Sequence, residues 1–84
     1  MIMNNHFLPI KEKLAEILQR KRIQSEITTE QLVEKMHKVG VKMSVKTYER
    51  IENGNFYPTL ETFFMLLKVL NCQLTIDGEN LLEE

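Results

Sequence analysis

The chain has 84 residues, of which 43% are hydrophobic and 27% charged, and its formal net charge is −1. This composition is typical of a soluble globular protein, so we expect one small domain. The single cysteine, Cys72, excludes an internal disulfide and a cysteine-rich zinc site, and it is typical of a protein in the reducing cytosol. Residues 1–8 contain neither a basic region nor a long apolar run, so we expect a cytoplasmic protein without a signal peptide or membrane span.

Charge is distributed unevenly along the chain. Residues 1–50 carry ten Lys and Arg against six Glu, which gives a net charge of +4. Residues 51–84 carry one Lys against six Asp and Glu, which gives −5. The nearly neutral total argues mildly against nucleic-acid binding. The basic first half and acidic second half are nevertheless typical of a protein that presents one face to phosphate and another face to a different partner.

We expect a flexible arm over residues 1–8 and a helical domain over residues 9–72. Pro9 suits the first turn of a helix, and the apolar residues that follow it have helical spacing: Ile10, Leu14, Ile17 and Leu18. This pattern predicts a first helix that runs to about Gln24. A second helix is predicted to begin at the capping box Thr28-Thr29-Glu30-Gln31 and to end near Gly40.

The segment from Ser44 to Gly54 predicts a short third helix. Ser44 can accept a hydrogen bond from a backbone N–H at its start, and Gly54 can adopt the left-handed conformation that closes its end. Helical spacing divides its side chains into a core face with Ser44, Thr47, Tyr48 and Ile51, and an outer face with Val45, Lys46, Glu49, Arg50 and Asn53. The outer face has the methyl groups, long cations and hydrogen-bonding groups that read base edges in a major groove. The alternative is an ordinary amphipathic surface helix.

A fourth helix is predicted to start after Thr59, its N-cap, and to end at Asn71 or Cys72. It is too apolar for a surface helix with a single stripe. We therefore expect it to be the central helix of the core, or to form part of a dimer face.

Residues 73–78 alternate between polar and apolar side chains, which predicts a strand that turns at Asp77-Gly78. We expect this strand to have no partner within the chain and to pair with a second copy in a homodimer, through Leu74 and Ile76. The alternative is an extended segment that covers the core. Residues 79–84 predict a frayed acidic tail.

Two strings follow the first two helices: Arg50–Gly54, which reads R-I-E-N-G, and Pro58–Thr62, which reads P-T-L-E-T. With Ile27–Val33 ahead of them, the chain resembles the helix-turn-helix domains of the lambdoid phage repressors and their bacterial relatives of the xenobiotic-response-element type. The resemblance covers roughly Leu14 to Leu70. It implies an all-α, compact, four- to five-helix repressor-like domain. The C-terminal segment resembles the antitoxin-like branch of that family, in which a short strand pairs across the dimer.

The resemblance implies a role for each matching position. It implies DNA base contacts for four residues: Val45, Lys46, Thr47 and Arg50. It implies DNA backbone contacts for six others: Thr28, Thr29, Ser44, Asn53, Asn55 and Tyr57. Arg22 and Glu52 match positions that form a structural ion pair between the first helix and the recognition helix.

Three departures from the family pattern are present. The connector before Ser44 is about five residues longer than in the family, so either the second helix is longer or the loop is larger. Tyr48 occupies a position that is usually aliphatic, so its hydroxyl needs a hydrogen-bond partner or access to solvent. The loop after Gly54 lacks the Lys or Arg often found there, which predicts a shallower dependence of DNA affinity on salt.

Enzymatic chemistry has little support in the sequence. His6 and His37 are not paired with a carboxylate at ligand or triad spacing, and there is no glycine-rich phosphate loop and no metal-ligand cluster. We expect no catalytic residues, no metal and no cofactor. The favoured hypothesis is a dimeric DNA-binding transcriptional regulator, a repressor on a palindromic operator, with the antitoxin of a toxin–antitoxin pair as a special case. The alternative is a protein-interaction module that keeps the helix-turn-helix fold without DNA binding.

Overall fold

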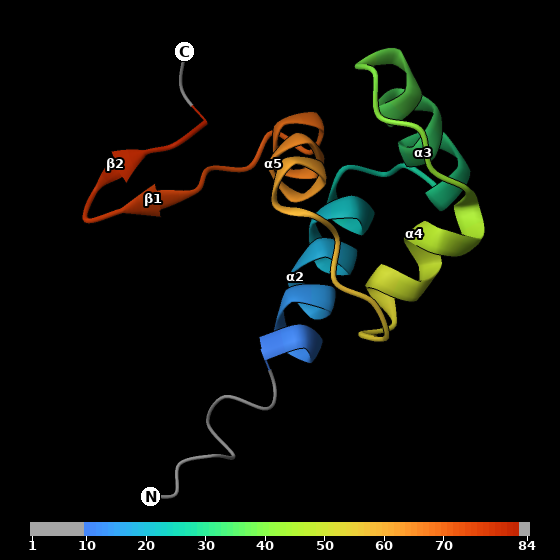
Figure 1. The fold of residues 1–84 in the computed structure, drawn as a ribbon, viewed down its shortest axis with the longest axis horizontal. Helices are drawn as coiled ribbons and strands as arrows, with labels where there is room; N and C mark the ends of the chain where they lie inside the picture. Colours follow the sequence, from blue (N-terminus) through green and yellow to red (C-terminus); the bar gives the residue numbers. More distant parts are fainter. Residues whose placement is uncertain (1–9, 83–84) are drawn as a thin grey trace, which may run out of the picture.

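The structure, a computed structural model, describes residues 10–82, and within them it contains helices, a hairpin and short loops. Four helices come first: α2 (Ile10–Gln24), α3 (Thr29–Lys38), α4 (Val45–Glu52) and α5 (Leu60–Val69). A two-stranded sheet of β1 (Thr75–Ile76) and β2 (Glu79–Asn80) follows. Figure 1 shows α3 and α4 on one side of the molecule and the hairpin on the other. The small, mostly helical domain is as predicted, whereas the arm over 1–8 and Pro9 lie outside the described residues.

Three helices begin directly after the N-cap residues that the sequence predicts. Thr28 accepts a hydrogen bond from the Gln31 backbone N–H at 3.0 Å, and its own N–H donates to Gln31 Oε1 at 2.8 Å, which completes the capping box. Ser44 caps α4 by accepting from the Thr47 N–H at 3.0 Å. Thr59 caps α5 by accepting from the Thr62 N–H at 3.1 Å.

Two helix ends depend on left-handed backbone conformations. Gly54, with φ of +78°, follows the C-cap of α4 and turns the chain into the next loop, as predicted. The end of α5 comes earlier than predicted, at Val69. Asn71 adopts φ of +58°, and a residue in this conformation cannot continue a right-handed helix.

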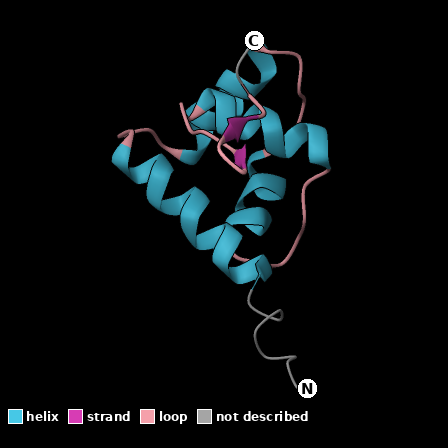
Figure 2. Cartoon of the chain, turned by 90° about the vertical axis from the view of Figure 1, so that its left-hand side faces the viewer, coloured by secondary structure: helices cyan, strands magenta, loops and turns pink. Residues whose placement is uncertain are grey.

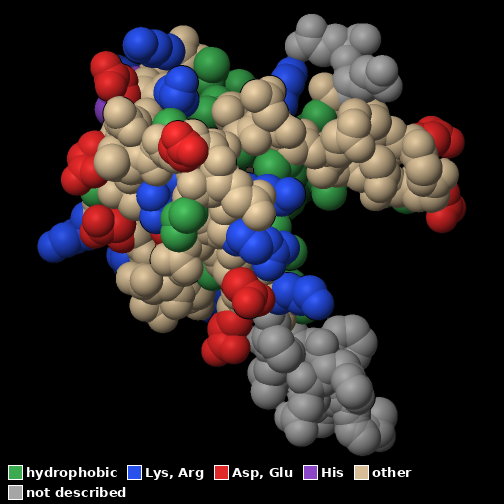
Figure 3. Space-filling model, turned by 180° about the vertical axis from the view of Figure 1, so that it is seen from behind, with side chains coloured by type: hydrophobic (Ala, Val, Ile, Leu, Met, Phe, Trp, Pro, Cys, Tyr) green, Lys and Arg blue, Asp and Glu red, His purple; other side chains and the backbone are tan. Residues whose placement is uncertain are grey.

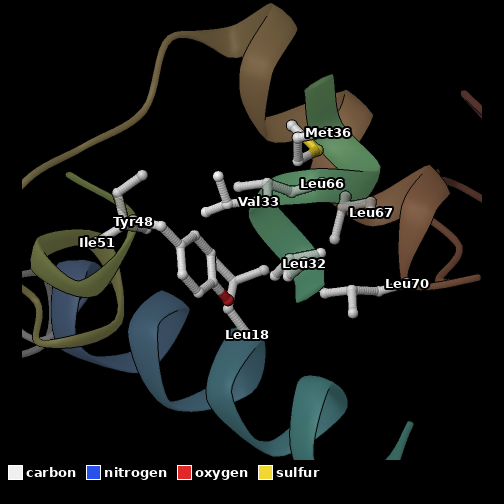
Figure 4. Close-up of a cluster of buried hydrophobic side chains, with 9 residues drawn as sticks. All are labelled: Leu18, Leu32, Val33, Met36, Tyr48, Ile51, Leu66, Leu67 and Leu70. Atoms are coloured by element: carbon white, nitrogen blue, oxygen red, sulfur yellow. The ribbon is translucent and has the colours of Figure 1, made fainter. Parts of the chain in front are cut away.

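The core lies where the four helices meet. Its fully buried side chains come from α2, α3, α4 and α5, and the largest are Leu18, Leu32, Met36, Tyr48 and Leu66. Figure 4 shows the ring of Tyr48 inside this cluster, with its oxygen directed toward α2. Helix α4 therefore packs against the core along one face, and Tyr48 and Ile51 are the buried apolar residues of that face.

The prediction that the C-terminal strand lacks a partner within the chain is wrong. β1 pairs with β2 in an antiparallel hairpin, with Thr75 opposite Asn80 and Ile76 opposite Glu79. Figure 2 shows this hairpin in front of the helices. The reason is the Asp77-Gly78 turn, in which both residues have positive φ, because that conformation matches the twist of two adjacent strands.

The hairpin also corrects the prediction of a frayed tail for residues 79–82, whereas residues 83–84 lie outside the described residues. Glu79 and Asn80 form β2, and the Leu81 N–H donates to the Leu74 carbonyl at 2.7 Å, which extends the pairing. Leu74 and Leu82 pack against the core cluster, whereas Ile76 is 61% exposed. The base of the hairpin therefore packs on the helical domain, whereas Ile76, next to the turn, is exposed.

Candidate nucleic-acid interface

An ion pair fixes α4 to α2. Arg22 Nε donates to Glu52 Oε2 at 2.6 Å, and Arg22 Nη2 donates to Glu52 Oε1 at 3.2 Å. Arg22 Nη1 also donates to the Ile27 carbonyl at 2.8 Å, which adds the α2–α3 loop to the same contact. The two side chains are 14% and 5% exposed, so the pair is largely shielded from water. The predicted contact between Arg22 and Glu52 is thus present, with the two-pronged geometry that favours arginine over lysine.

The hydroxyl of Tyr48 donates a hydrogen bond to Glu52 Oε2. This contact answers the question that the sequence left open, because a fully buried phenol needs a partner. Among the described residues, every buried side-chain nitrogen or oxygen has a hydrogen-bond partner. The pair of Arg22 and Glu52 therefore joins three elements. Glu52 accepts hydrogen bonds from α2 and from its own helix α4, and Arg22 donates one to the loop before α3.

Burial raises the pKa of the Tyr48 phenol well above its ordinary value, and the hydrogen bond to Glu52 raises it further. The hydrogen bond to Glu52 likewise raises the pKa of Arg22. Both groups therefore keep their protons throughout the physiological range, Tyr48 as a neutral donor and Arg22 as a cation.

A pH dependence of stability follows for Tyr48. In the unfolded chain its phenol ionises near pH ~10, whereas in the folded protein it stays neutral to a higher pH. The stabilisation is therefore complete below about pH 10, the pKa of the phenol in the unfolded chain. It is lost as pH rises from there toward the pKa of the folded protein, by up to about 1.4 kcal/mol per pH unit. Urea unfolding between neutral and strongly alkaline pH should show a steeper loss for the wild type than for Tyr48→Phe. Tyr57→Phe, which removes an exposed hydroxyl, is the matched control, and parallel curves for wild type and Tyr48→Phe would contradict the prediction.

The four predicted base-contact residues of α4 separate into two groups. Lys46 and Arg50 are exposed and lie one helical turn apart, so they share one side of the helix. Val45 and Thr47 are half-buried. Val45 packs against the core cluster, and Thr47 Oγ1 accepts a hydrogen bond from the Ser44 hydroxyl at 3.0 Å. The structure therefore leaves the two cations available on the outer face and engages the other two residues within the protein.

At the start of α3, the predicted phosphate ligands have partners inside the protein. The Thr28 hydroxyl and N–H are both used in the capping box. The Thr29 hydroxyl donates to Glu30 Oε1 at 3.3 Å, so it would have to exchange this carboxylate for a phosphate. The first turn of a helix nevertheless has backbone N–H groups without partners in the helix, and these are the donors that suit an anion.

Of the other predicted backbone contacts, Ser44 is exposed and uses its hydroxyl to cap α4. Three more lie in the loop between α4 and α5 and are all exposed: Asn53, Asn55 and Tyr57. The structure adds two contacts that sequence reasoning missed. The guanidinium of Arg50 lies over the ring of Phe56, with its carbon 5.4 Å from the ring centroid. The ammonium of Lys11 lies over the ring of Tyr57 at 4.9 Å. The only signal for these pairs was two consecutive aromatic residues in a loop after a helix that ends in Gly.

The long α3–α4 connector, residues 39–44, is held by His37. Its Nε2 lies 2.9 Å from the Met43 carbonyl oxygen and 3.3 Å from the Met43 nitrogen. The Val41 N–H also donates to the Met36 carbonyl at 2.9 Å. Because α3 ends at Lys38, the extra residues enlarge the loop and do not lengthen the helix.

The hairpin and the helical body differ in charge. Figure 3, a view from behind, shows Lys and Arg side chains interspersed with acidic ones over the helical body, and acidic side chains alone at the tip of the projecting hairpin. That tip contains the turn residue Asp77 and Glu79 of β2. The helical body is therefore the better surface for a polyanion.

Residues 10–82 contain neither a candidate metal site nor a candidate membrane span. In this part of the chain, no three or more His, Cys, Asp or Glu side chains form a group that could hold a metal ion. None of the helices there has the length and apolar character needed to cross a membrane.

Comparison of the chain with protein-family models, with curated proteins and with solved structures found no match. A functional assignment therefore rests on the geometry of the molecule itself.

Proposed function

We propose that the protein is a sequence-specific DNA-binding transcriptional regulator, acting as a dimeric repressor. One observation carries this proposal: α4 is fixed on one side, and its other side presents two long cations together with Glu49. Tyr48, Ile51 and Glu52 are its buried residues, and Lys46 and Arg50 extend from its exposed side. A helix that is held rigidly while it presents long hydrogen-bonding cations has the properties needed for reading base edges.

The dimensions of α4 are compatible with this role. An α-helix with its side chains is about 10–12 Å in diameter, and a major groove of B-DNA is about 12 Å wide. Arg50 can donate two parallel hydrogen bonds to guanine O6 and N7, and Lys46 can reach the same acceptors one turn away. The first turn of α3 and the α4–α5 loop would then contact the phosphates on either side of the groove.

A dimer would bind a palindromic operator with one copy on each half-site. Two copies of α4 would enter successive major grooves about 34 Å apart. The hairpin is the surface that we assign to the contact between copies, because its strands offer unpaired edges in the described residues and Ile76 is 61% exposed. An antitoxin is a special case of this function, in which the acidic C-terminal half would contact a toxin protein.

The dimer contact is tested by Ile76→Lys. We expect this variant to have half the mass of the wild type in sedimentation equilibrium, since a charge opposite its own copy opposes pairing. Leu60→Lys is the matched control, because Leu60 is 66% exposed at the start of α5 and is not part of the hairpin. An unchanged mass for Ile76→Lys would exclude the hairpin as the dimer contact.

The function is tested by selection of bound duplexes from a random pool at low salt. We expect enrichment of a palindrome whose half-sites lie about one helical turn apart. Absence of enrichment would exclude sequence-specific binding. It would instead favour a protein-interaction module that keeps the helix-turn-helix fold without DNA binding, an alternative favoured by the nearly neutral net charge of the chain.

A further inference from the structure

Arg50 and Phe56 form an exposed pair at the end of α4. The guanidinium carbon lies 5.4 Å from the ring centroid, and the Phe56 side chain is 42% exposed. Phe56 is not a member of the core cluster and does not pack against it. A single exposed apolar side chain is ordinary on a protein surface, so the feature that carries the argument is the specific contact between Phe56 and Arg50.

The backbone of the loop brings Phe56 back toward Arg50. The Gly54 N–H donates to the Ile51 carbonyl at 3.1 Å, and the Asn55 N–H donates to the carbonyl of Arg50 itself at 2.9 Å. Gly54, with φ of +78°, makes this reversal possible. The loop therefore folds back on the last turn of α4, and the position of Phe56 is set by the same residue whose side chain it contacts.

The next residue, Tyr57, holds the loop from the other side. Its ring contacts the Lys11 ammonium at 4.9 Å, and Lys11 belongs to α2. Two consecutive aromatic residues thus contact cations on two different helices. Tyr57 ties the loop to α2, and this contact stabilises the arrangement in which Phe56 faces Arg50.

We propose that Phe56 is a positioning residue, which orders the Arg50 side chain for base recognition before DNA binds. This inference rests on the DNA-binding function proposed above. A free arginine side chain has many rotamers, and their restriction opposes binding. A ring beneath the guanidinium removes part of that loss in advance, while the N–H donors stay available in the guanidinium plane. Phe56 therefore contributes to sequence preference without itself contacting a base.

The test measures base preference at the one position in each half-site that depends on Arg50. For Phe56→Leu, we expect the ratio of affinities for the preferred and the altered base pair to fall about twofold to fivefold. Phe56→Trp, which keeps an aromatic face, should retain the ratio. Leu60→Ala is the matched control, since it removes another exposed apolar side chain, from the neighbouring helix. In an Arg50→Ala background, Phe56→Leu should cause no further change.

The other possible results distinguish a failure of the positioning role from a failure of the proposed function. If Phe56→Leu relaxes preference equally with and without Arg50, Phe56 contacts DNA directly and the positioning role is wrong. If Arg50→Ala relaxes the preference while Phe56→Leu leaves it intact, the positioning role is wrong and the proposed function stands. If the wild type has no base preference, the proposed function fails and the positioning role fails with it. In the free protein, the Arg50 side-chain proton shifts should move in Phe56→Leu and stay in Leu60→Ala, because a ring current acts only at close range.

Discussion

Replacement of Arg22 by Met is expected to lower the free energy of unfolding by about 3–5 kcal/mol. The side chains of Arg22 and Glu52 are only 14% and 5% exposed, so the variant leaves a carboxylate buried with Tyr48 as its one remaining donor. The Ile27 carbonyl also loses its hydrogen bond. For a domain of this size, such a loss is a large part of the total, which is about 0.05–0.15 kcal/mol per residue. Urea unfolding at neutral pH measures it.

The control for this prediction is Arg20→Met, which removes an exposed cation from the same helix and should change stability by less than about 0.5 kcal/mol. A second comparison is the triple variant Arg22→Met/Tyr48→Phe/Glu52→Leu. It should recover most of the loss, because the removal of all partners leaves no buried charge. A loss below about 1 kcal/mol for Arg22→Met would show that the pair behaves like one on the surface.

Substitution of Arg50 by Ala is expected to have the largest effect on DNA binding. A two-pronged arginine–guanine contact contributes about 1–3 kcal/mol of discrimination against the wrong base pair. Competition binding on selected and singly altered duplexes should therefore show that preference is lost at one base pair in each half-site and kept elsewhere. Arg50→Lys should also lose that preference while it retains the salt dependence of the wild type, since lysine keeps the charge without the fork.

The comparison variant is Lys13→Ala, an exposed cation of α2 that lies outside the proposed interface. It should leave base preference unchanged. If Arg50→Ala weakens binding equally for all duplexes and reduces the salt dependence, then Arg50 contacts phosphate, and α4 does not read sequence through it.

Much of the local structure could be predicted from the sequence because its causes are local. Thr28, Ser44 and Thr59 each cap a helix with a side chain that reaches a backbone N–H three residues ahead. Gly54 ends α4 for an equally local reason. The contact between Arg22 and Glu52, which are 30 residues apart, was predicted only through the resemblance to a known family.

The remaining features depend on contacts between distant parts of the chain. Asp77-Gly78 was recognised as a turn, but the acidic residues after it concealed the second strand. Val45 lies on the outer face of an ideal helix, yet in the structure it packs against the core cluster, as Val41 and Met43 of the enlarged connector also do. The stacking of Arg50 on Phe56 depends on how the loop folds back, which no helical or strand periodicity describes.

The central claim is that the exposed side of α4 contacts DNA. Amide chemical-shift mapping of the isotope-labelled wild-type protein, titrated with the selected duplex, tests it most directly. The account predicts that the perturbed amides concentrate at the start of α3, along α4 around Lys46 and Arg50, and in the loop from Asn53 to Tyr57. It predicts small changes in the hairpin around Ile76. Perturbations centred on the hairpin, or none at all, would contradict it.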